Sequence, residues 1–243
     1  MTEEFNRQAV SILSRYNFAP TQLAKKHLVE EGKDPASIWI TGNTVIDAMA
    51  HTVVEDYTHP ELEWVGDSRM IFITAHRREN LGQPMHNMFR AIRRVLDEHP
   101  DVKAIYPIHM NPVVRQAADE ELGDCGQIHI IEPVEVFDCH NFEARCYLCL
   151  TDSGGIQEEC PSYGKPVLVM RDTTERPEGV DAGTLRLVGT DEEKIYSEFT
   201  KLLDDKAEYD KMSRACNPYG DGHACERIAD ILEGKEYSPW AAK

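Results

Sequence analysis

The stretch YLCLTDSGGIQEECPSYGKPVLVM, residues 147–170, decides the fold of this chain. It contains two short apolar runs, Tyr147–Thr151 and Pro166–Met170, which are typical of buried strands. A glycine turn and a segment of helical character lie between them. Two strands joined through a helix lie parallel in one sheet. The stretch therefore predicts an α/β fold.

The same alternation of strand and helix extends to both sides of this stretch. One helical stripe consists of Met85, Met88, Phe89, Ile92, Val95 and Leu96. Further strands are predicted at Ile38–Thr41, Met70–Thr74, Val102–Ile108, Gln127–Ile131 and Thr184–Val188. This alternation predicts a parallel sheet with helices on both faces. Ligands of such sheets bind beyond the carboxyl ends of the strands.

Composition excludes several classes of protein. The chain has 243 residues, of which 41% are hydrophobic and 28% charged, so we expect a globular protein with one large domain or one and a half. Its 43 acidic and 26 basic residues give a net charge of −17, which argues against a nucleic-acid partner. We find no run of ~18 apolar residues and no signal peptide, and therefore expect no membrane partner and a cytoplasmic location.

The cysteines favour a reducing compartment. There are seven, an odd number, and all lie between Cys125 and Cys225. Cys146 and Cys149 form a C-x-x-C pair, but they lie in an apolar run and no second Cys/His pair has ligand spacing. We interpret them as core residues and expect no metal.

Basic side chains gather at the predicted strand ends although they are scarce in the chain. They are His76, Arg77 and Arg78 after one strand, His109 after the next, and Arg171 and Arg176 after Pro166–Met170. The carboxyl ends of parallel strands meet at one edge of a sheet, so these groups are expected to lie close together. The sequence therefore predicts an anionic ligand.

The glycine turn indicates which anion. Ser153, Gly154 and Gly155 lead from a strand into a helix, which exposes backbone N–H groups and the positive end of a helix dipole to a phosphate. Such a glycine pair can also be a purely structural turn. Glu158 and Glu159 follow one turn later, where a carboxylate can accept hydrogen bonds from a ribose. A sugar nucleotide satisfies both features.

Five blocks of sequence together show a family resemblance. They are TGNTVIDA (41–48), TAHRRENLG (74–82), YPIHMNP (106–112), LTDSGGIQEECPSYGKPVLVMRDTTERPEGVDAGT (150–184) and NPYGDG (217–222). In this order and spacing they resemble the non-hydrolysing UDP-N-acetylglucosamine 2-epimerases. The resemblance implies a GT-B-type α/β fold, with two Rossmann-like halves that enclose the substrate and UDP held mainly by the C-terminal half.

The resemblance also implies roles for particular residues. Ser153, Gly154 and Gly155 match the positions that bind the diphosphate, Glu159 the ribose ligand, and Arg176 a ligand of the phosphates or the sugar. His76 matches the catalytic-site histidine. Arg77 and His109 match positions that contact a second, activating UDP-N-acetylglucosamine.

Two further positions match the family's pattern less closely. The opening TEEFNR, residues 2–7, looks like a family block in which Glu3 would be a catalytic glutamate. Cys139 stands where the family usually shows a phenylalanine close to the uracil, and a cysteine offers less stacking surface. Phe137 or Phe142 could compensate.

Simpler explanations exist for several of these residues. His76 could cap its loop, and Arg77, Arg78 and Glu79 could be a solvated charge cluster. Glu3 could belong to a frayed helix start. Arg176 could form an ion pair with Glu175 or Glu178.

The motif order predicts three parts. Residues 1–42 look like the tail of an N-terminal Rossmann-like domain. Residues 43–221 look like the UDP-binding Rossmann-like domain, and residues 222–243 look like a crossover helix with a tail. The family acts by eliminating UDP to give 2-acetamidoglucal and adding UDP back, which interconverts UDP-N-acetylglucosamine and UDP-N-acetylmannosamine for surface polysaccharides without metal or nicotinamide. A homodimer is expected at full length.

Three alternatives remain open from the sequence. The chain could be a catalytically silent UDP-sugar-binding fragment, because most of the family's first domain has no counterpart here. It could also be a hydrolysing epimerase or a GT-B glycosyltransferase.

Overall fold

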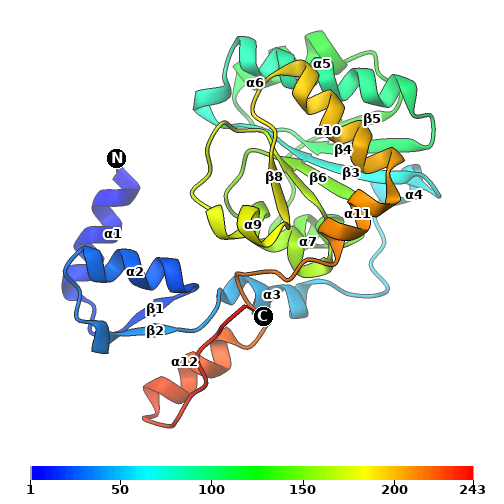
Figure 1. The fold of residues 1–243 in the computed structure, drawn as a ribbon. Coiled ribbons are helices and arrows are strands. Elements are labelled where there is room, and N and C mark those ends of the chain that lie inside the picture. The colour runs from blue at the N-terminus through cyan, green and yellow to red at the C-terminus, as the bar shows by residue number, and fades with distance from the viewer. Residues whose placement is uncertain (1, 243) are drawn as a thin grey trace. The chain divides into compact units, whose positions relative to one another are not determined.

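The structure is a computed structural model that describes residues 2–242, with side chains for residues 4–242 (Figure 1). The chain forms two compact units. The large unit contains residues 51–217, and the small unit contains residues 1–50 and 218–243. The domain limits expected at residues 42 and 221 stay predictions, because compact units and evolutionary domains need not divide at the same residue.

A six-stranded parallel sheet forms the centre of the large unit. Its strands are β3 (Arg69–Thr74), β4 (Val102–Pro107), β5 (Ile128–Ile131), β6 (Leu148–Thr151), β7 (Val167–Val169) and β8 (Leu185–Leu187). They lie in the order β5-β4-β3-β6-β7-β8. All six were predicted from apolar runs bounded by turn residues, and the structure confirms them.

Helices cover both faces of this sheet (Figure 1). Side chains alternate across a strand, so Ile71 and Ile73 face one layer and Phe72 faces the other. The first layer contains α5 (Gln83–Glu98), α6 (Pro112–Leu122), α10 (Glu192–Asp204) and α11 (Lys206–Ser213). The second contains α4 (Pro60–Val65), α7 (Val136–Arg145), α8 (Ile156–Glu159), η3 (Cys160–Tyr163) and α9 (Pro177–Ala182). Cys146 and Cys149 are fully buried in the second layer, in agreement with their interpretation as core residues.

The strand order reverses between β3 and β6. The chain proceeds from β3 to β4 and β5 on one side, and from β6 to β7 and β8 on the other. Thr74 and Thr151, the last residues of β3 and β6, are paired in register, and their hydroxyl oxygens lie 2.5 Å apart. Because loops after these two strands diverge in opposite directions, this switch point leaves a crevice for a ligand.

The small unit combines both ends of the chain. It contains α1 (Thr2–Leu13), β1 (Asn17–Ala19), α2 (Gln22–Glu30), η1 (Pro35–Ser37), β2 (Ile38–Ile40), most of α3 (Thr44–Thr52) and α12 (Ala224–Leu232). The strands β1 and β2 are parallel. β1 was not predicted, because its three residues are too few to show a period.

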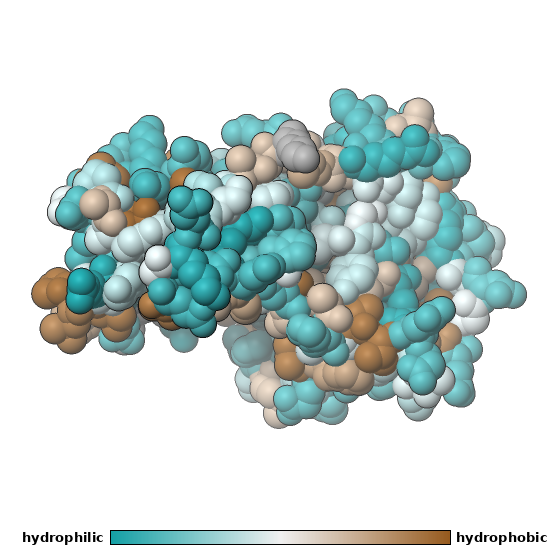
Figure 2. All heavy atoms as spheres, turned by 90° about the horizontal axis from the view of Figure 1, so that it is seen from below, coloured by the Kyte–Doolittle hydropathy of each residue, from teal (hydrophilic) through white to brown (hydrophobic). Residues whose placement is uncertain are grey.

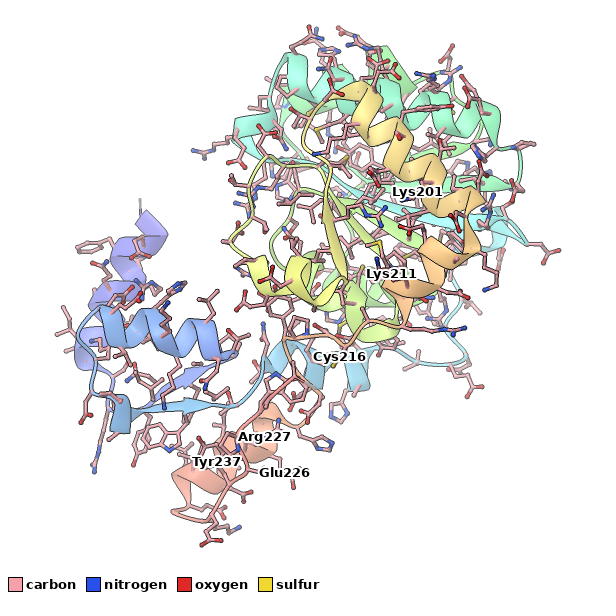
Figure 3. All side chains as sticks on the ribbon, viewed as in Figure 1. Lys201, Lys211, Cys216, Glu226, Arg227 and Tyr237 are labelled. Atoms are coloured by element: carbon pink, nitrogen blue, oxygen red, sulfur yellow. The ribbon has the colours of Figure 1, made fainter. Side chains whose placement is uncertain are left out.

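Side chains of the small unit join its N-terminal and C-terminal segments. The Asp47 carboxylate accepts hydrogen bonds from the backbone N–H groups of Ala224 (3.1 Å) and Cys225 (2.7 Å) at the start of α12. Arg227, labelled in Figure 3, donates to the backbone oxygen of Thr41 at 3.0 Å and to the Asp221 carboxylate at 2.7 Å. These contacts satisfy the free N–H groups at the start of α12 and place it beside the end of β2.

The surface is mainly hydrophilic on the face shown in Figure 2, with separate hydrophobic patches. Large hydrophobic side chains are exposed on α1, where Leu13 is 88% and Ile12 78% exposed. Within residues 2–242, no helix has both the length and the apolar character needed to cross a membrane.

Candidate functional site

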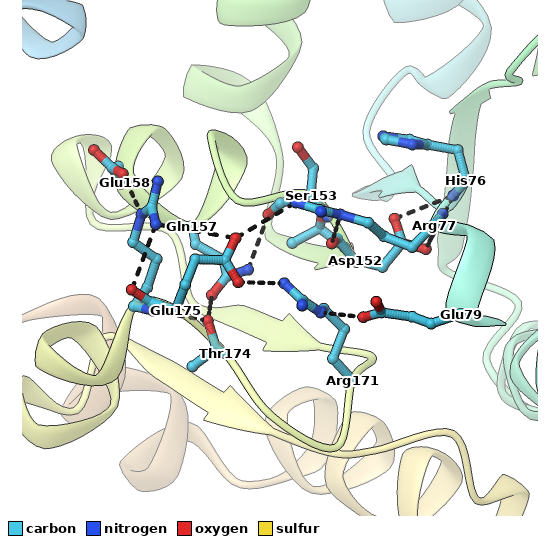
Figure 4. A network of polar contacts seen from close by, with 12 residues as sticks. His76, Arg77, Glu79, Asp152, Ser153, Gln157, Glu158, Arg171, Thr174 and Glu175 are labelled. Carbon is cyan, nitrogen blue, oxygen red and sulfur yellow. Dashed lines mark hydrogen bonds and ion pairs between the residues drawn. The ribbon is translucent and has the colours of Figure 1, made fainter. Parts of the chain in front are cut away.

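The buried Asp152 organises the switch point. It follows β6 directly, and its carboxylate accepts hydrogen bonds from the backbone N–H groups of His76 (3.0 Å) and Arg77 (2.8 Å) and from the Asn80 side-chain amide (3.0 Å). Figure 4 shows the contacts of Asp152 with His76 and Arg77, which follow β3. Several donors to one buried carboxylate compensate its desolvation. The loop after β3 is therefore held against the end of β6.

Asn80 connects a third strand to this arrangement. It is buried at the end of η2 (Arg78–Asn80), and its amide also donates to the backbone oxygen of Met170 at 3.1 Å, just after β7. Asn80 was not singled out from the sequence. A polar residue within a charged loop gives no local signal that it will be buried.

The glycine turn follows Asp152. The Ser153 backbone N–H donates to the Thr151 hydroxyl at 2.9 Å, and Gln157 donates to the Ser153 backbone oxygen at 3.0 Å. A Cβ atom on Gly154 would lie 2.7 Å from Oε1 of Glu175, 3.5 Å from Nη2 of Arg77 and 3.7 Å from Nη2 of Arg176. The predicted phosphate turn and two of the predicted arginines are therefore together.

Glu175 connects the cations around this turn. Its carboxylate forms ion pairs with Arg171 (2.6 Å), Arg77 (3.4 Å) and Arg176 (3.9 Å), as Figure 4 shows for Arg171. Burial raises the pKa of Glu175, but its own backbone N–H and Arg171 outweigh this effect and the pKa lies below the usual value. Arg171 also pairs with Glu79 at 2.8 Å. The guanidinium groups thus already hold one carboxylate beside Gly154.

Arg176 has a different main partner from those considered in the sequence. Its Nε donates to the carboxylate of Glu158, and Glu175 lies at the longer distance given above. The pairing with Glu158 was not expected. Glu158 is buried, whereas Arg176 is partly exposed at the start of α9.

Glu159 ends α8, and its side chain is 16% exposed. Its Oε1 lies 3.1 Å from the Cβ position of Gly155, and its Oε2 lies 4.0 Å from Nε2 of the buried His140. Burial raises the pKa of Glu159, and a hydrogen bond from Glu143 lowers it. The predicted ribose ligand thus lies beside the predicted phosphate turn.

A cavity of about 440 Å³ opens within the large unit at the same strand ends. Its polar lining includes His76, His109, Ser153 and Cys139. Its apolar lining includes Phe72, Pro107, Ile108, Val134 and Ile156. This volume and this mainly apolar wall are typical of small-molecule sites. The predicted uracil-side residue, Cys139, therefore shares one cavity with both predicted histidines.

His76 and His109 stack with their ring centroids 5.3 Å apart. Burial lowers the pKa of His76, and the nearby His109 and Arg77 lower it further against the opposing effect of Asp152. His76 is therefore neutral at pH 7 and can accept a proton. The backbone N–H of Asn111 donates to Nδ1 of His109 at 3.0 Å, so neutral His109 carries its proton on Nε2.

Two other sequence predictions give less information. Glu3 falls in α1, but its side chain lies outside the described residues. Arg78 is exposed, as expected for a solvated charge.

Among the residues that the structure describes, no group of three or more His, Cys, Asp or Glu side chains could hold a metal ion.

The strand order, the glycine turn with its guanidinium groups and the adjoining cavity define a Rossmann-like α/β protein with a candidate anion-binding site at the switch point. Comparison with known proteins makes this class more specific. Residues 1–233 match the family model of UDP-N-acetylglucosamine 2-epimerase. The chain belongs to this family, which confirms the resemblance read from its motifs.

Similarity to individual proteins agrees with this assignment. A Bacillus subtilis UDP-N-acetylglucosamine 2-epimerase is 59% identical over 230 residues, which are 95% of this chain and 60% of that protein. A Staphylococcus aureus structure with UDP is 48% identical with a TM-score of 0.93, covering 98% of this chain and 67% of that one. A Neisseria meningitidis 2-epimerase bound to UDP-N-acetylglucosamine is 40% identical with a TM-score of 0.87, covering 96% and 65%.

These comparisons confirm the expected GT-B-type α/β fold with its Rossmann-like parallel sheet. The chain spans about 60% of the length of the Bacillus subtilis relative.

Proposed function

We propose that this chain binds UDP-N-acetylglucosamine and supplies the nucleotide-holding part of a UDP-N-acetylglucosamine 2-epimerase. The observation that carries the proposal is the position of Gly154, beside which Arg77 and Arg176 hold the Glu175 carboxylate, next to Ser153 in the wall of the cavity. Cations that already hold an anionic group at a glycine turn suit a diphosphate in its place, and a mainly apolar cavity suits a base. Relatives solved with UDP and with UDP-N-acetylglucosamine support this choice of ligand.

Each part of the nucleotide has a candidate partner. The diphosphate would lie on Ser153, Gly154 and Gly155, with Arg176 as its cationic ligand. Glu159 would accept hydrogen bonds from the ribose hydroxyls, because its carboxylate lies beside Gly155. Uracil would enter the cavity near Cys139.

The proposed chemistry is an elimination followed by an addition. The proton on C2 of the sugar is not adjacent to a carbonyl group, so direct removal is unfavourable. Instead, the C1–O bond breaks with its electron pair passing to UDP, and a base takes the C2 proton to leave 2-acetamidoglucal. A UDP oxygen then attacks C1 while a proton reaches C2 from the opposite face.

The residues of the large unit suit the leaving-group side of this reaction. Guanidinium groups and backbone N–H groups stabilise the charge that develops on UDP as the C1–O bond breaks. Neutral His76 is a candidate for proton transfer at the sugar, and such transfers typically contribute 10²–10⁴-fold. Glu3 stays a predicted catalytic partner. Arg77 and His109 stay predicted contacts for a second, activating nucleotide sugar.

A second candidate function is binding of UDP without catalysis. The observation that favours it is that the proposed diphosphate, ribose and uracil partners all lie in the large unit, whereas the predicted catalytic Glu3 belongs to the small unit. Catalysis needs acid and base groups held in alignment, whereas the proposed nucleotide contacts need the large unit alone. In this candidate function UDP binds and turnover is weak or absent.

Calorimetry and NMR separate these candidates. We expect UDP to bind, and both Arg176→Ala and Glu159→Ala to weaken binding, whereas Arg94→Ala and Glu193→Ala, which remove an exposed ion pair elsewhere, leave it unchanged. Unaltered binding in both site variants would refute the placement of the nucleotide. The C1 proton of UDP-N-acetylglucosamine then reports the reaction: UDP-N-acetylmannosamine indicates epimerisation, free N-acetylmannosamine with UDP indicates hydrolysis, and no change indicates binding alone.

Cellular context follows from the same proposal. An enzyme that makes UDP-N-acetylmannosamine would act in the cytoplasm and supply sugars for surface polysaccharides. We also propose that the full-length protein is a homodimer, which light scattering of the purified protein would test.

A further inference from the structure

Glu143 is a fully buried carboxyl group that the proposed function does not use. It lies on α7, in the helical layer that also contains α8, and its exposed fraction is 0%. The Cys139 thiol donates to its Oε1 at 3.2 Å. Among the described residues, its Oε2 is buried with no hydrogen-bond partner. An unpaired buried oxygen of this kind costs free energy unless it carries a proton that it can donate.

The neighbour that could receive this proton is Glu159. Its Oε2 lies 4.0 Å from Nε2 of His140, which belongs to α7 like Glu143, so Glu159 lies against the helix that carries Glu143. The mutual effect of the two carboxyl groups on their pKa values agrees with this placement. Two adjacent carboxyl groups in a buried place do not both ionise and instead share one proton. Glu143 is fully buried and the Glu159 side chain is 16% exposed, so the charge is less costly on Glu159.

The pKa values agree with this assignment. Burial raises the pKa of Glu143 well above its usual value, and the Glu159 charge raises it further. Burial also raises the pKa of the Cys139 thiol, which therefore keeps its hydrogen and continues to donate to Oε1. The proton of Glu143 is then left on Oε2, the oxygen without a partner.

One further charged group acts on this pair: Glu158, which raises the pKa of Glu159 and is itself ion-paired with Arg176. The cysteine, tyrosine and histidine side chains around the pair are neutral at pH 7. Burial raises the pKa values of the thiols of Cys146, Cys149 and Cys160 and of the Tyr163 phenol. Burial also lowers the pKa of His140, whose Nε2 faces Glu159. The Thr52 hydroxyl lies 2.7 Å from Nδ1 of His140 and can donate to it, which places the ring hydrogen on Nε2, toward Glu159.

We propose that Glu143 is a positioning residue: as a neutral acid it donates a hydrogen bond from Oε2 to the Glu159 carboxylate, and so holds that carboxylate ionised and oriented toward the two hydroxyl groups of a ribose. This inference rests on the proposed function, in which Glu159 is the ribose ligand. If Glu143 acts in this way, a residue of α7 contributes to the preference of the site for a ribose over a sugar that lacks the two hydroxyl groups.

Calorimetry with UDP and with 2′,3′-dideoxy-UDP measures that discrimination. Glu143→Met has similar volume but no donor, whereas Glu143→Gln keeps an N–H donor. We expect Glu143→Met to lower the ratio of the affinities for UDP and dideoxy-UDP by about tenfold, which is the effect of one hydrogen bond to a charged group. The affinity for dideoxy-UDP itself should change little. Glu143→Gln should restore the preference.

Other outcomes have definite meanings, provided that thermal unfolding shows both variants to be folded. A Glu143→Met variant that keeps the wild-type preference, or that loses affinity for both nucleotides equally, would overturn the inference. If the wild-type protein bound no UDP, the proposed function would fail instead.

Infrared spectroscopy then tests Glu143 without any ligand. A protonated carboxyl group should give a carbonyl band at pH 8 in the wild-type protein and in Glu159→Gln, and this band should vanish in Glu143→Gln. Absence of the band from the wild-type spectrum would overturn the inference independently of nucleotide binding.

Discussion

The Asp152 carboxylate accepts a hydrogen bond from the backbone N–H of Arg77 at 2.8 Å, across the point where the strand order reverses. This contact joins the loop after β3 to the end of β6. It places Arg77 beside Gly154, where a phosphate would bind. The geometry of the candidate site therefore depends on a side chain that need not touch the ligand.

The stability of the protein should depend on Asn80, which helps Asp152 to hold the loop after β3. Asn80→Ala removes hydrogen bonds to Asp152 and Met170 and leaves a buried carboxylate with one donor fewer. We expect the free energy of unfolding in urea to fall by about 1–3 kcal/mol. Gln83→Ala removes an exposed amide contact to Asn87 and is the matched control. Equal stability of the two variants would contradict this account of Asp152.

The space above Gly154 should be essential for nucleotide binding. In Gly154→Ala the new methyl group would fall 2.7 Å from Glu175 Oε1 and occupy the proposed phosphate position. We expect the affinity for UDP to fall by about tenfold or more, or ~1.4 kcal/mol. Gly126→Ala is the control, because a Cβ atom there meets nothing within 4 Å. Undiminished binding by Gly154→Ala in calorimetry would place the diphosphate elsewhere.

Glu175 should compete with a bound diphosphate. Its carboxylate pairs with Arg171, Arg77 and Arg176, the cations that the phosphate would use. Glu175→Gln removes this competing charge, so the affinity for UDP should rise. We expect a rise of only roughly two- to tenfold, because partly exposed ion pairs contribute little individually. Calorimetry at low salt measures this effect, with Glu193→Gln as a control on an exposed pair. Weaker binding would show that Glu175 orients the arginines instead.

His76 should titrate below the usual histidine value of 6.5. Burial is the main cause, and charge on His109 adds to it, so His109→Gln should move the pKa of His76 upward. Below pH 6.5 His76 is protonated more readily in the unfolded chain than in the folded protein. This residue therefore makes the free energy of unfolding fall as the pH falls. NMR of the ring protons from pH 5 to 8 gives the midpoint. A value at or above 6.5 would disagree with the burial of the ring.

Glu143 should affect stability in the opposite direction. Its pKa is raised in the folded protein, so its stabilising contribution is complete below the unfolded value of about 4.5 and is lost as pH rises toward the folded value. Glu143→Gln has no proton to lose. The unfolding free energy of this variant relative to wild type should therefore increase from pH 5 to pH 8 in urea titrations. A difference that does not change with pH would mean that Glu143 is not protonated.

Much of the fold could be predicted because its signals are local. Apolar runs bounded by glycine, proline or aspartate marked every strand of the large sheet, and the helical stripe that begins at Met85 marked α5. β1 was missed, since three residues give no periodicity. The glycine turn at Ser153–Gly155 and the basic residues after three of the strands were likewise visible, because each occupies a short stretch next to a predicted element.

The sequence by itself determined the alternation of strands and helices, the turn and the residue types at the strand ends. Only the tertiary structure decided which of them meet. Asn80 contacts Asp152, 72 residues further along the chain, and Arg176 pairs with Glu158 rather than with its neighbours. Glu159 lies 4.0 Å from His140, on the helix that carries Glu143, because α7 and α8 cover the same face of the sheet. Such contacts depend on strand order and helix packing, and local propensity specifies neither.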